Sequence, residues 1–150
     1  MIPQGTLLAG PGLEVELISP GTFVYTWETS PVSKPVTVTP VSVTSELVEV
    51  ETWFSGCRGC NHKNPERAKT GMIVQVSAGS EFLLKNGGFV AVEDLSPGQR
   101  LLAIGCKCGY EEVREVRTVV PPNSVMLYEI SGVENYGITD GKHILVVRSQ

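Results

Sequence analysis

The chain has 150 residues, of which 41% are hydrophobic and 19% charged, a composition typical of a globular domain and not of a disordered one. Its formal net charge of −4 argues against a nucleic-acid partner, which would require a basic face. The longest apolar runs are far shorter than the roughly 20 residues of a membrane-spanning helix, and no leader-like segment opens the chain. We therefore expect no membrane partner, no signal peptide, and a cytoplasmic protein or part of an assembly formed in the cytoplasm.

The first part of the chain predicts a β-hairpin between residues 5 and 26. Residues 13–18 alternate apolar and acidic side chains at period two, which is typical of a strand, and Pro20-Gly21 marks the turn that follows. Residues 28–40 contain three prolines among many Ser and Thr residues. For this segment we predict an extended edge or connecting segment, and no central helix or strand.

The remaining chain predicts further short strands. Period-two alternation or β-branched residues indicate them at residues 41–44, 46–51, 72–77, 110–120, 125–130 and 144–147. An Asp-Gly pair at 140–141 predicts a tight turn before the last strand. No segment indicates a helix longer than two turns, so the predicted fold class is all-β.

A repeat indicates how these strands are organised. Residues 15–26 and 92–103 share Val, Glu, Ser, Pro and Gly at identical spacing. Two copies are too few for a solenoid. We therefore predict one domain, residues 1–150, built from two pseudo-symmetric β-subunits of about 1–52 and 72–150, with a loop insertion at about 53–71.

The four cysteines form two tight pairs, Cys57 with Cys60 and Cys106 with Cys108. Four thiolates at this spacing can hold a structural zinc ion in a tetrahedral shell. Disulfides between the two pairs are the alternative, unlinked thiols are a third, and His62 could replace one of the sulfur ligands. Four sulfurs leave no open position for water, so a catalytic zinc is not expected.

Three blocks of the chain resemble the Hint fold, which inteins, hedgehog autoprocessing domains and bacterial intein-like domains share. The first runs from Gly5-Thr6-Leu7-Leu8 to Ser19-Pro20-Gly21, the second from Ile73 to Gly98, and the third from Leu127 to Val146. Together they span almost the whole chain. The resemblance implies a Hint-like fold of two related β-subunits.

The same resemblance implies that the catalytic residues of the family are replaced. The first-position Cys or Ser, which attacks the preceding carbonyl, reads Met1, whose thioether is no acyl acceptor. The Thr-x-x-His pair reads Ser77 and Ser80, and serine cannot shuttle protons near neutral pH as imidazole does. The closing His-Asn reads Val147-Arg148, and only Ser149 matches a downstream nucleophile. We predict no catalytic residue, and His143 is expected to be an ordinary, partly exposed side chain.

These observations predict a non-enzymatic, catalytically inactive Hint-like module with a structural or protein-interaction role in a larger assembly, such as a virion or tail-like particle. Its partners would be other proteins or copies of itself, reached through sheet edges, the segment 28–40 or the cysteine-bearing insertion. One alternative is residual intein-like autoprocessing through Ser149 or a cysteine such as Cys57. Another is a regulatory binding module that depends on zinc or on redox state.

Overall fold

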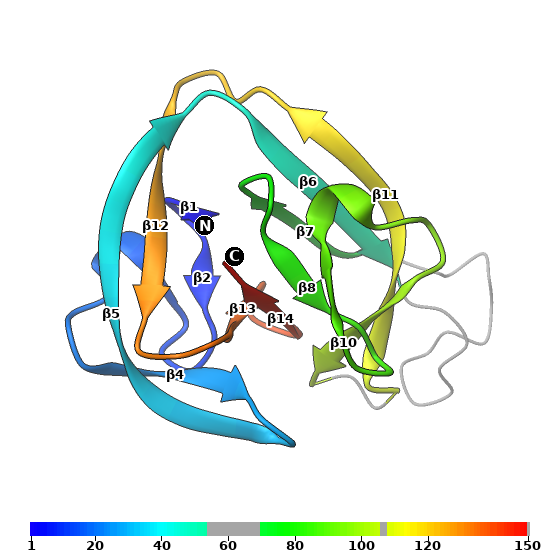
Figure 1. Cartoon of the computed structure of the whole chain (residues 1–150), viewed down its shortest axis with the longest axis horizontal. Helices are drawn as coiled ribbons and strands as arrows, with labels where there is room; N and C mark the ends of the chain where they lie inside the picture. Colours follow the sequence, from blue (N-terminus) through cyan, green and yellow to red (C-terminus); the bar gives the residue numbers. More distant parts are fainter. Residues whose placement is uncertain (54–69, 106–107, 150) are drawn as a thin grey trace.

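The protein is nearly all β, as predicted (Figure 1). The computed structural model describes residues 1–53, 70–105 and 108–149. Two short 3₁₀ turns, η1 (Val15–Leu17) and η4 (Val92–Asp94), interrupt the strands. The strands are β1 (Ile2–Pro3), β2 (Leu7–Leu8), β3 (Leu13–Glu14), β4 (Thr22–Trp27), β5 (Pro31–Thr44), β6 (Leu47–Trp53), β7 (Thr70–Val76), β8 (Glu81–Leu83), β9 (Phe89–Ala91), β10 (Arg100–Ile104), β11 (Tyr110–Val119), β12 (Val125–Ser131), β13 (Tyr136–Thr139) and β14 (Ile144–Arg148).

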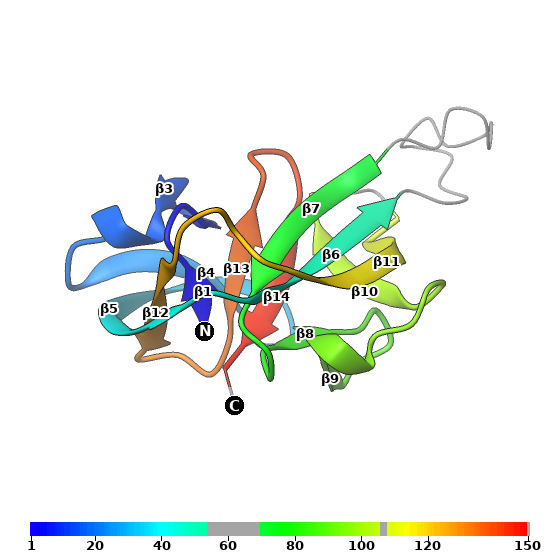
Figure 2. The same cartoon turned by 90° about the horizontal axis from the view of Figure 1, so that it is seen from above.

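The strands form two antiparallel sheets. One has the order β1-β12-β5-β4, and the other runs β3-β2-β13-β14-β10-β11-β6-β7, with β8 on β14 and β9 on β8. Figures 1 and 2 show β5 with β12 on one side of the molecule and β6 with β11 on the other. The short strands β13 and β14 lie between them, so the end of the chain enters the middle of the fold.

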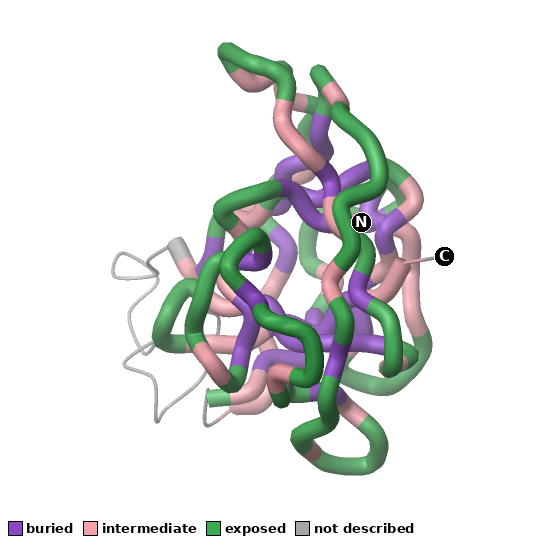
Figure 3. Tube along the Cα trace, turned by 90° about the vertical axis from the view of Figure 1, so that its left-hand side faces the viewer, coloured by how far each residue is buried: buried purple, intermediate pink, exposed green. Residues whose placement is uncertain are grey.

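Most of the buried apolar side chains form one cluster, and the buried stretches of the chain are purple in Figure 3. The largest fully buried members of this cluster come from both halves of the chain and include Ile2, Leu8, Met72, Phe82 and Leu101. Burial of a large apolar side chain contributes roughly 1.5–3 kcal/mol, so this shared cluster stabilises the two halves together. A second, smaller cluster consists of Leu83, Leu102 and Val146, with Trp27, Phe89 and Ile104 packed against it.

The sequence repeat is a structural repeat. Each copy contains a strand, a 3₁₀ turn, a Ser-Pro-Gly turn and a second strand. In the first copy Gly21 N donates to Val36 O at 2.9 Å, and in the second Gly98 N donates to Val113 O at 2.8 Å. Both glycines have positive φ, +83° and +92°, a conformation that other residues rarely adopt. The two pseudo-symmetric β-subunits are therefore present.

The predicted strand at 13–18 is wrong over its second half, because residues 15–17 form η1. Val15 is fully buried and Ile18 is 9% exposed, whereas Leu17 is 62% exposed. The apolar side chains that face the core are thus three residues apart, and Ile18 N donates to Val15 O as a 3₁₀ turn requires. The second copy behaves in the same way at η4.

The proline-rich segment 28–40 is more regular than predicted, since most of it belongs to the 14-residue strand β5. Residues 31–36 pair with β4 and residues 37–44 pair with β12. Among the described residues, each half of β5 thus has one hydrogen-bonded neighbour and one side without a neighbour. Because proline has no main-chain N–H, a proline on that side leaves no donor unpaired. Pro40 also lies beside a register shift. The prediction that no central strand forms here is therefore wrong: β5 lies between β12 and β4 in the sheet, although it pairs with each of them over a different half of its length.

In the second half of the chain, the strand predicted at 110–120 and the turn predicted at 140–141 are confirmed, but the strand that precedes this turn was missed. Residues 110–119 form β11, and Gly141 makes the expected turn with φ +96°. That turn joins β14 to β13, a strand that was not predicted. Within the described residues, no helix is long and apolar enough to cross a membrane.

Candidate functional site

The beginning of the chain is held at the end of β7. The α-amino nitrogen of Met1 donates to Ser77 Oγ at 2.9 Å and to Ser80 Oγ at 3.0 Å. In return Ser77 Oγ and Ser80 Oγ donate to the Met1 carbonyl oxygen at 3.0 and 3.2 Å, and Ser77 N donates to the same oxygen at 3.0 Å. Ser77 directly follows β7 and Ser80 directly precedes β8, so the turn between these strands presents both hydroxyls to Met1.

Ser77 and Ser80 hold the Met1 main chain in place, and we call these three residues the clamp. Both serines are buried, at 8% and 3% exposure, and their hydroxyls lie 3.2 Å apart. Burial lowers the pKa of the Met1 amino group, and the nearby Glu129 carboxylate opposes the shift. The two serine hydroxyls fix the Met1 amino and carbonyl groups by hydrogen bonds, and neither these hydroxyls nor the Met1 thioether titrates near neutral pH as an imidazole does.

Arg148 reaches the same region from the last strand. In the ladder between β14 and β8, Arg148 is opposite Glu81, the residue after Ser80. Its Nε donates to Glu81 Oε1 at 2.6 Å, and its guanidinium carbon lies 4.0 Å from the centroid of the Phe89 ring. Arg148 thus lies opposite Glu81, which directly follows the Ser80 that binds Met1, and Arg148 is held by an ion pair and a cation–π contact.

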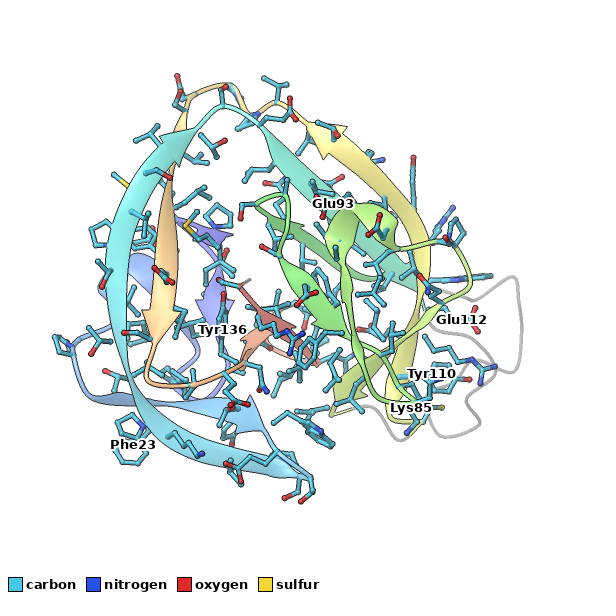
Figure 4. All side chains as sticks on the ribbon, in the orientation of Figure 1. Phe23, Lys85, Glu93, Tyr110, Glu112 and Tyr136 are labelled. Carbon is cyan, nitrogen blue, oxygen red and sulfur yellow. The ribbon has the colours of Figure 1, made fainter. Side chains whose placement is uncertain are left out.

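A cavity of about 710 Å³ adjoins this centre. Tyr136 lies toward the middle of the molecule (Figure 4) and is only 2% exposed. Burial raises its pKa to about 12, with the neighbouring Ser149 hydroxyl opposing the shift. The phenol therefore stays protonated at neutral pH and is no general base. The residues that line the cavity are Glu81, Glu129, Ile130, Val133, Glu134, Tyr136, Arg148 and Ser149.

Ser149, the predicted downstream nucleophile, lines this cavity. Its Oγ is buried and makes no hydrogen bond of ordinary geometry to any described residue. Val147, the other residue at the family's closing position, is buried in the main core. The sequence-predicted residues from both ends of the chain thus meet in one region.

A second polar cluster was not predicted. Glu111 on β11 is fully buried, and its Oε1 lies 3.2 Å from His143 Nδ1. Gly71 packs against the same Oε1, so closely that a Cβ at position 71 would lie 2.2 Å from it. The other carboxylate oxygen, Glu111 Oε2, has no hydrogen-bond partner among the described residues. Burial raises the pKa of Glu111, and the hydrogen bond with His143 opposes the shift. His143, expected to be ordinary, is therefore engaged with a buried carboxylate.

A signal for Glu111 was present in the sequence. It occupies the same face of β11 as the buried Val113, two positions away, so the period-two pattern already placed a carboxylate inward. No comparable pattern points to His143, which precedes β14 in a turn.

The predicted metal ligands fall almost entirely outside the described residues. Cys57, Cys60 and Cys106 lie there, as does His62, together with most of the predicted insertion at about 53–71. Cys108, the one cysteine among the described residues, is disulfide-bonded. Within the described part of the chain, no three His, Cys, Asp or Glu side chains gather closely enough to hold a metal ion.

The two related β-subunits and the meeting of the chain ends at their centre define the Hint fold of inteins. A bacterial intein-like domain from Clostridium thermocellum has a TM-score of 0.66 and 21% identity, over 97% of this chain and 96% of that one. A DnaB intein from Synechocystis sp. PCC 6803 has a TM-score of 0.65 and 17% identity, over 99% and 98%.

The Msm DnaB1 intein splicing domain, whose structure is bound with zinc, has a TM-score of 0.61 and 16% identity, with full coverage of both chains. No family model and no curated protein matches the sequence. At these identities the likeness shows a shared fold.

Proposed function

We propose that the chain is a Hint-fold module that does not process itself and acts as a structural or protein-interaction part of a larger assembly. The observation that carries this proposal is the clamp of Met1, Ser77 and Ser80 at the position where the fold family begins its chemistry. Acyl transfer there needs a nucleophile and a proton donor for the leaving nitrogen. The Met1 thioether is no nucleophile at the first position, and the hydroxyls of Ser77 and Ser80 replace the imidazole that would protonate the leaving nitrogen.

The rest of the centre supports the same proposal. Arg148 has no amide that could cyclise, and its guanidinium is held by Glu81 and Phe89. The Tyr136 phenol stays protonated because burial raises its pKa to about 12. The arrangement joins the two ends of the described chain to the core, which is a structural role.

A reporter fusion tests the proposal. A folded reporter is joined upstream of Met1 and a second one downstream of Gln150, and intact mass is followed at pH 6–9 with and without added thiol. We expect the fusion to remain whole under all these conditions. Loss of either reporter from the unaltered chain would contradict the proposal.

A restored centre provides the matched comparison. Met1→Cys combined with Ser80→His places a thiol and an imidazole at two positions that already lie within hydrogen-bond contact through their main-chain and hydroxyl groups. We expect thiol-dependent release of the upstream reporter from the double variant, and none from Ser80→His alone. If the double variant released no reporter, restoring these two side chains alone would not be enough to restore self-processing.

Residual autoprocessing is the second candidate function, and two observations favour it. The structural neighbours are inteins, one of them described as a splicing domain. The Ser149 hydroxyl lines the cavity without a hydrogen-bond partner among the described residues. In the same fusion, Ser149→Ala and Cys57→Ala would abolish any cleavage that depends on Ser149 or Cys57.

We also propose that the four cysteines tie the insertion at about 53–71 to the core, through zinc or through disulfides. A sulfur in a disulfide is no thiolate ligand, so the bond at Cys108 favours disulfides in this structure, whereas zinc at all four sulfurs requires that bond to be reduced. The zinc-bound Msm DnaB1 intein domain gives the metal weak support. A regulatory role in binding would follow from exchange between the two forms.

Metal content and alkylation on one sample separate these alternatives. Disulfides leave no thiol to alkylate before reduction, whereas a zinc site gives one zinc per chain and four alkylated cysteines after chelation. If chelation or reduction changes neither stability nor binding, the cysteines have no regulatory role. The cytoplasm, or an assembly formed there, remains the proposed location, to be tested by fractionation.

A further inference from the structure

Among the described residues, strand β7 has one hydrogen-bonded neighbour, β6, and ends the larger sheet. The main chain of β7 shows which of its groups face away from β6. Met72 N donates to Thr52 Oγ1 on β6 at 2.8 Å, whereas Ser77 N donates away from β6 to Met1 O. Since main-chain direction alternates along a strand, Val74 faces β6, and Ile73 and Gln75 direct their N–H and C=O groups to the free edge.

Beyond the register irregularity between Thr70 and Ile73, this edge has no proline or charged side chain of the kind that often prevents strands from pairing. The segment Met72–Val76 contains no proline and no charged residue, and Ile73 is 54% exposed. Natural sheets commonly protect an edge of this kind with lysine, proline, a bulge or a covering loop. The strand at the other end of the same sheet, β3, has only two residues. The free edge of β7 is therefore open to an added strand.

A groove of about 410 Å³ runs beside this edge. Ile73, Val74 and Gln75 form one wall, and the segments 3–7 and 138–140 form the others. The groove lies between β7 and residues 3–7, so an occupant that pairs with β7 lies within it as a single extended segment.

From these contacts we propose that the groove binds an extended segment of a partner protein, which pairs with β7 as an additional strand. Main-chain bonds to Ile73 and Gln75 provide the affinity, as in other cases of strand addition. Asp140 is the one charged residue among those lining the groove, so the segment carries a basic side chain at that end. The proposal rests on the protein-interaction role above but not on the absence of self-processing.

Selection of peptides tests the docking site directly. A phage-displayed library of eight-residue peptides is selected on the whole chain, and the enriched peptides are synthesised and titrated. We expect alternating sequences with a Lys or Arg, whose dissociation constant rises roughly tenfold or more on Ile73→Pro and Gln75→Pro, because each removes an N–H that the ligand uses. Asp140→Asn should weaken basic peptides selectively, and Phe23→Ala, an exposed apolar side chain elsewhere, should change nothing.

The proline variants are suited to this test because the N–H groups they remove have no partner on β6. Proline is tolerated at such edge positions, so both variants should unfold at nearly the temperature of the unaltered chain. Val74→Pro removes an N–H that faces β6 and should destabilise the fold. If a proline variant does not fold, peptides N-methylated at alternate residues test the same bonds from the ligand side, and only one of the two alternate sets should lose binding.

Each outcome decides a different claim. Enriched peptides that bind both proline variants and the N-methylated series unchanged would overturn the β7 site and leave the interaction role standing. If no peptide is enriched on any face, the docking site and the interaction role both fail. Neither result bears on the reporter fusion, which tests self-processing separately.

Discussion

Glu16 and Glu93 hold equivalent places in the two halves of the molecule, each accepting the main-chain N–H of a glycine. Gly5 N donates to the two Glu16 oxygens at 2.8 and 3.0 Å, and Gly79 N donates to those of Glu93 at 2.9 and 3.0 Å. Each carboxylate stands on a 3₁₀ turn and holds the loop that precedes β2 in the first half or β8 in the second, so the two halves use the same arrangement.

Because the two glutamates make equivalent hydrogen bonds, we expect the removal of either side chain to lower the free energy of unfolding by the same amount. Glu16→Ala and Glu93→Ala should each lower the free energy of unfolding by about 0.5–1 kcal/mol, the range for a solvent-exposed, charge-assisted hydrogen bond. Urea denaturation of the two variants and of the double variant measures this. A cost confined to one of them would show that the two turns do not stabilise the fold in the same way.

Arg148 and Arg100 form a matched pair for testing the closing strand. Arg148 lies over Phe89 and donates to Glu81 at 2.6 Å, whereas Arg100 is more exposed, over Tyr110, with Glu112 at 3.6 Å. We expect Arg148→Ala to lower the unfolding free energy by about 1 kcal/mol and Arg100→Ala by only a few tenths. If both variants lost the same unfolding free energy, the ion pair of Arg148 with Glu81 would contribute no more stability than the weaker contacts of Arg100.

Glu111 makes stability depend on pH. Because burial raises its pKa above the ordinary value of 4.5, the folded protein binds more protons than the unfolded chain between these two values. The free energy of unfolding should therefore decrease as pH rises through that window and recover as pH falls. Glu111→Gln removes the titrating group, so thermal unfolding measured from pH 4.5 to 8 should show a shallower slope for the variant. Identical slopes would contradict this reading of the buried carboxylate.

Gly71 is required by that carboxylate and not by its own backbone. A Cβ there would lie 2.2 Å from Glu111 Oε1 and 2.7 Å from Thr52 Oγ1. Gly71→Ala should cost about 1–3 kcal/mol through overpacking. Combined with Glu111→Ala, which removes the nearest atoms, the same substitution should cost clearly less than when made alone, and additive costs in the double-variant cycle would rule out the contact as the cause.

Much of this fold was predictable because the repeat and the strand pattern carry it. Ser-Pro-Gly at identical spacing predicted the two turns, and the resemblance assigned Met1, Ser77 and Ser80 to catalytic positions of one family, which the structure brings into hydrogen-bond contact. The 3₁₀ turns were missed because alternating Val15, Glu16 and Leu17 looks like a strand until burial shows which residues face inward. The β7 edge and the pair of Glu111 with His143 depend on which segments lie beside each other, and local pattern does not determine that.

The change of partner within β5 has a mechanical consequence. One unbroken stretch of main chain belongs to the ladder with β4 over residues 31–36 and to the ladder with β12 over residues 37–44. Tension applied to the hairpin of β4 and β5 passes along covalent bonds into the pairing with β12. The N-terminal hairpin should therefore resist being peeled from the molecule alone, and a force experiment should record both ladders giving way in a single event.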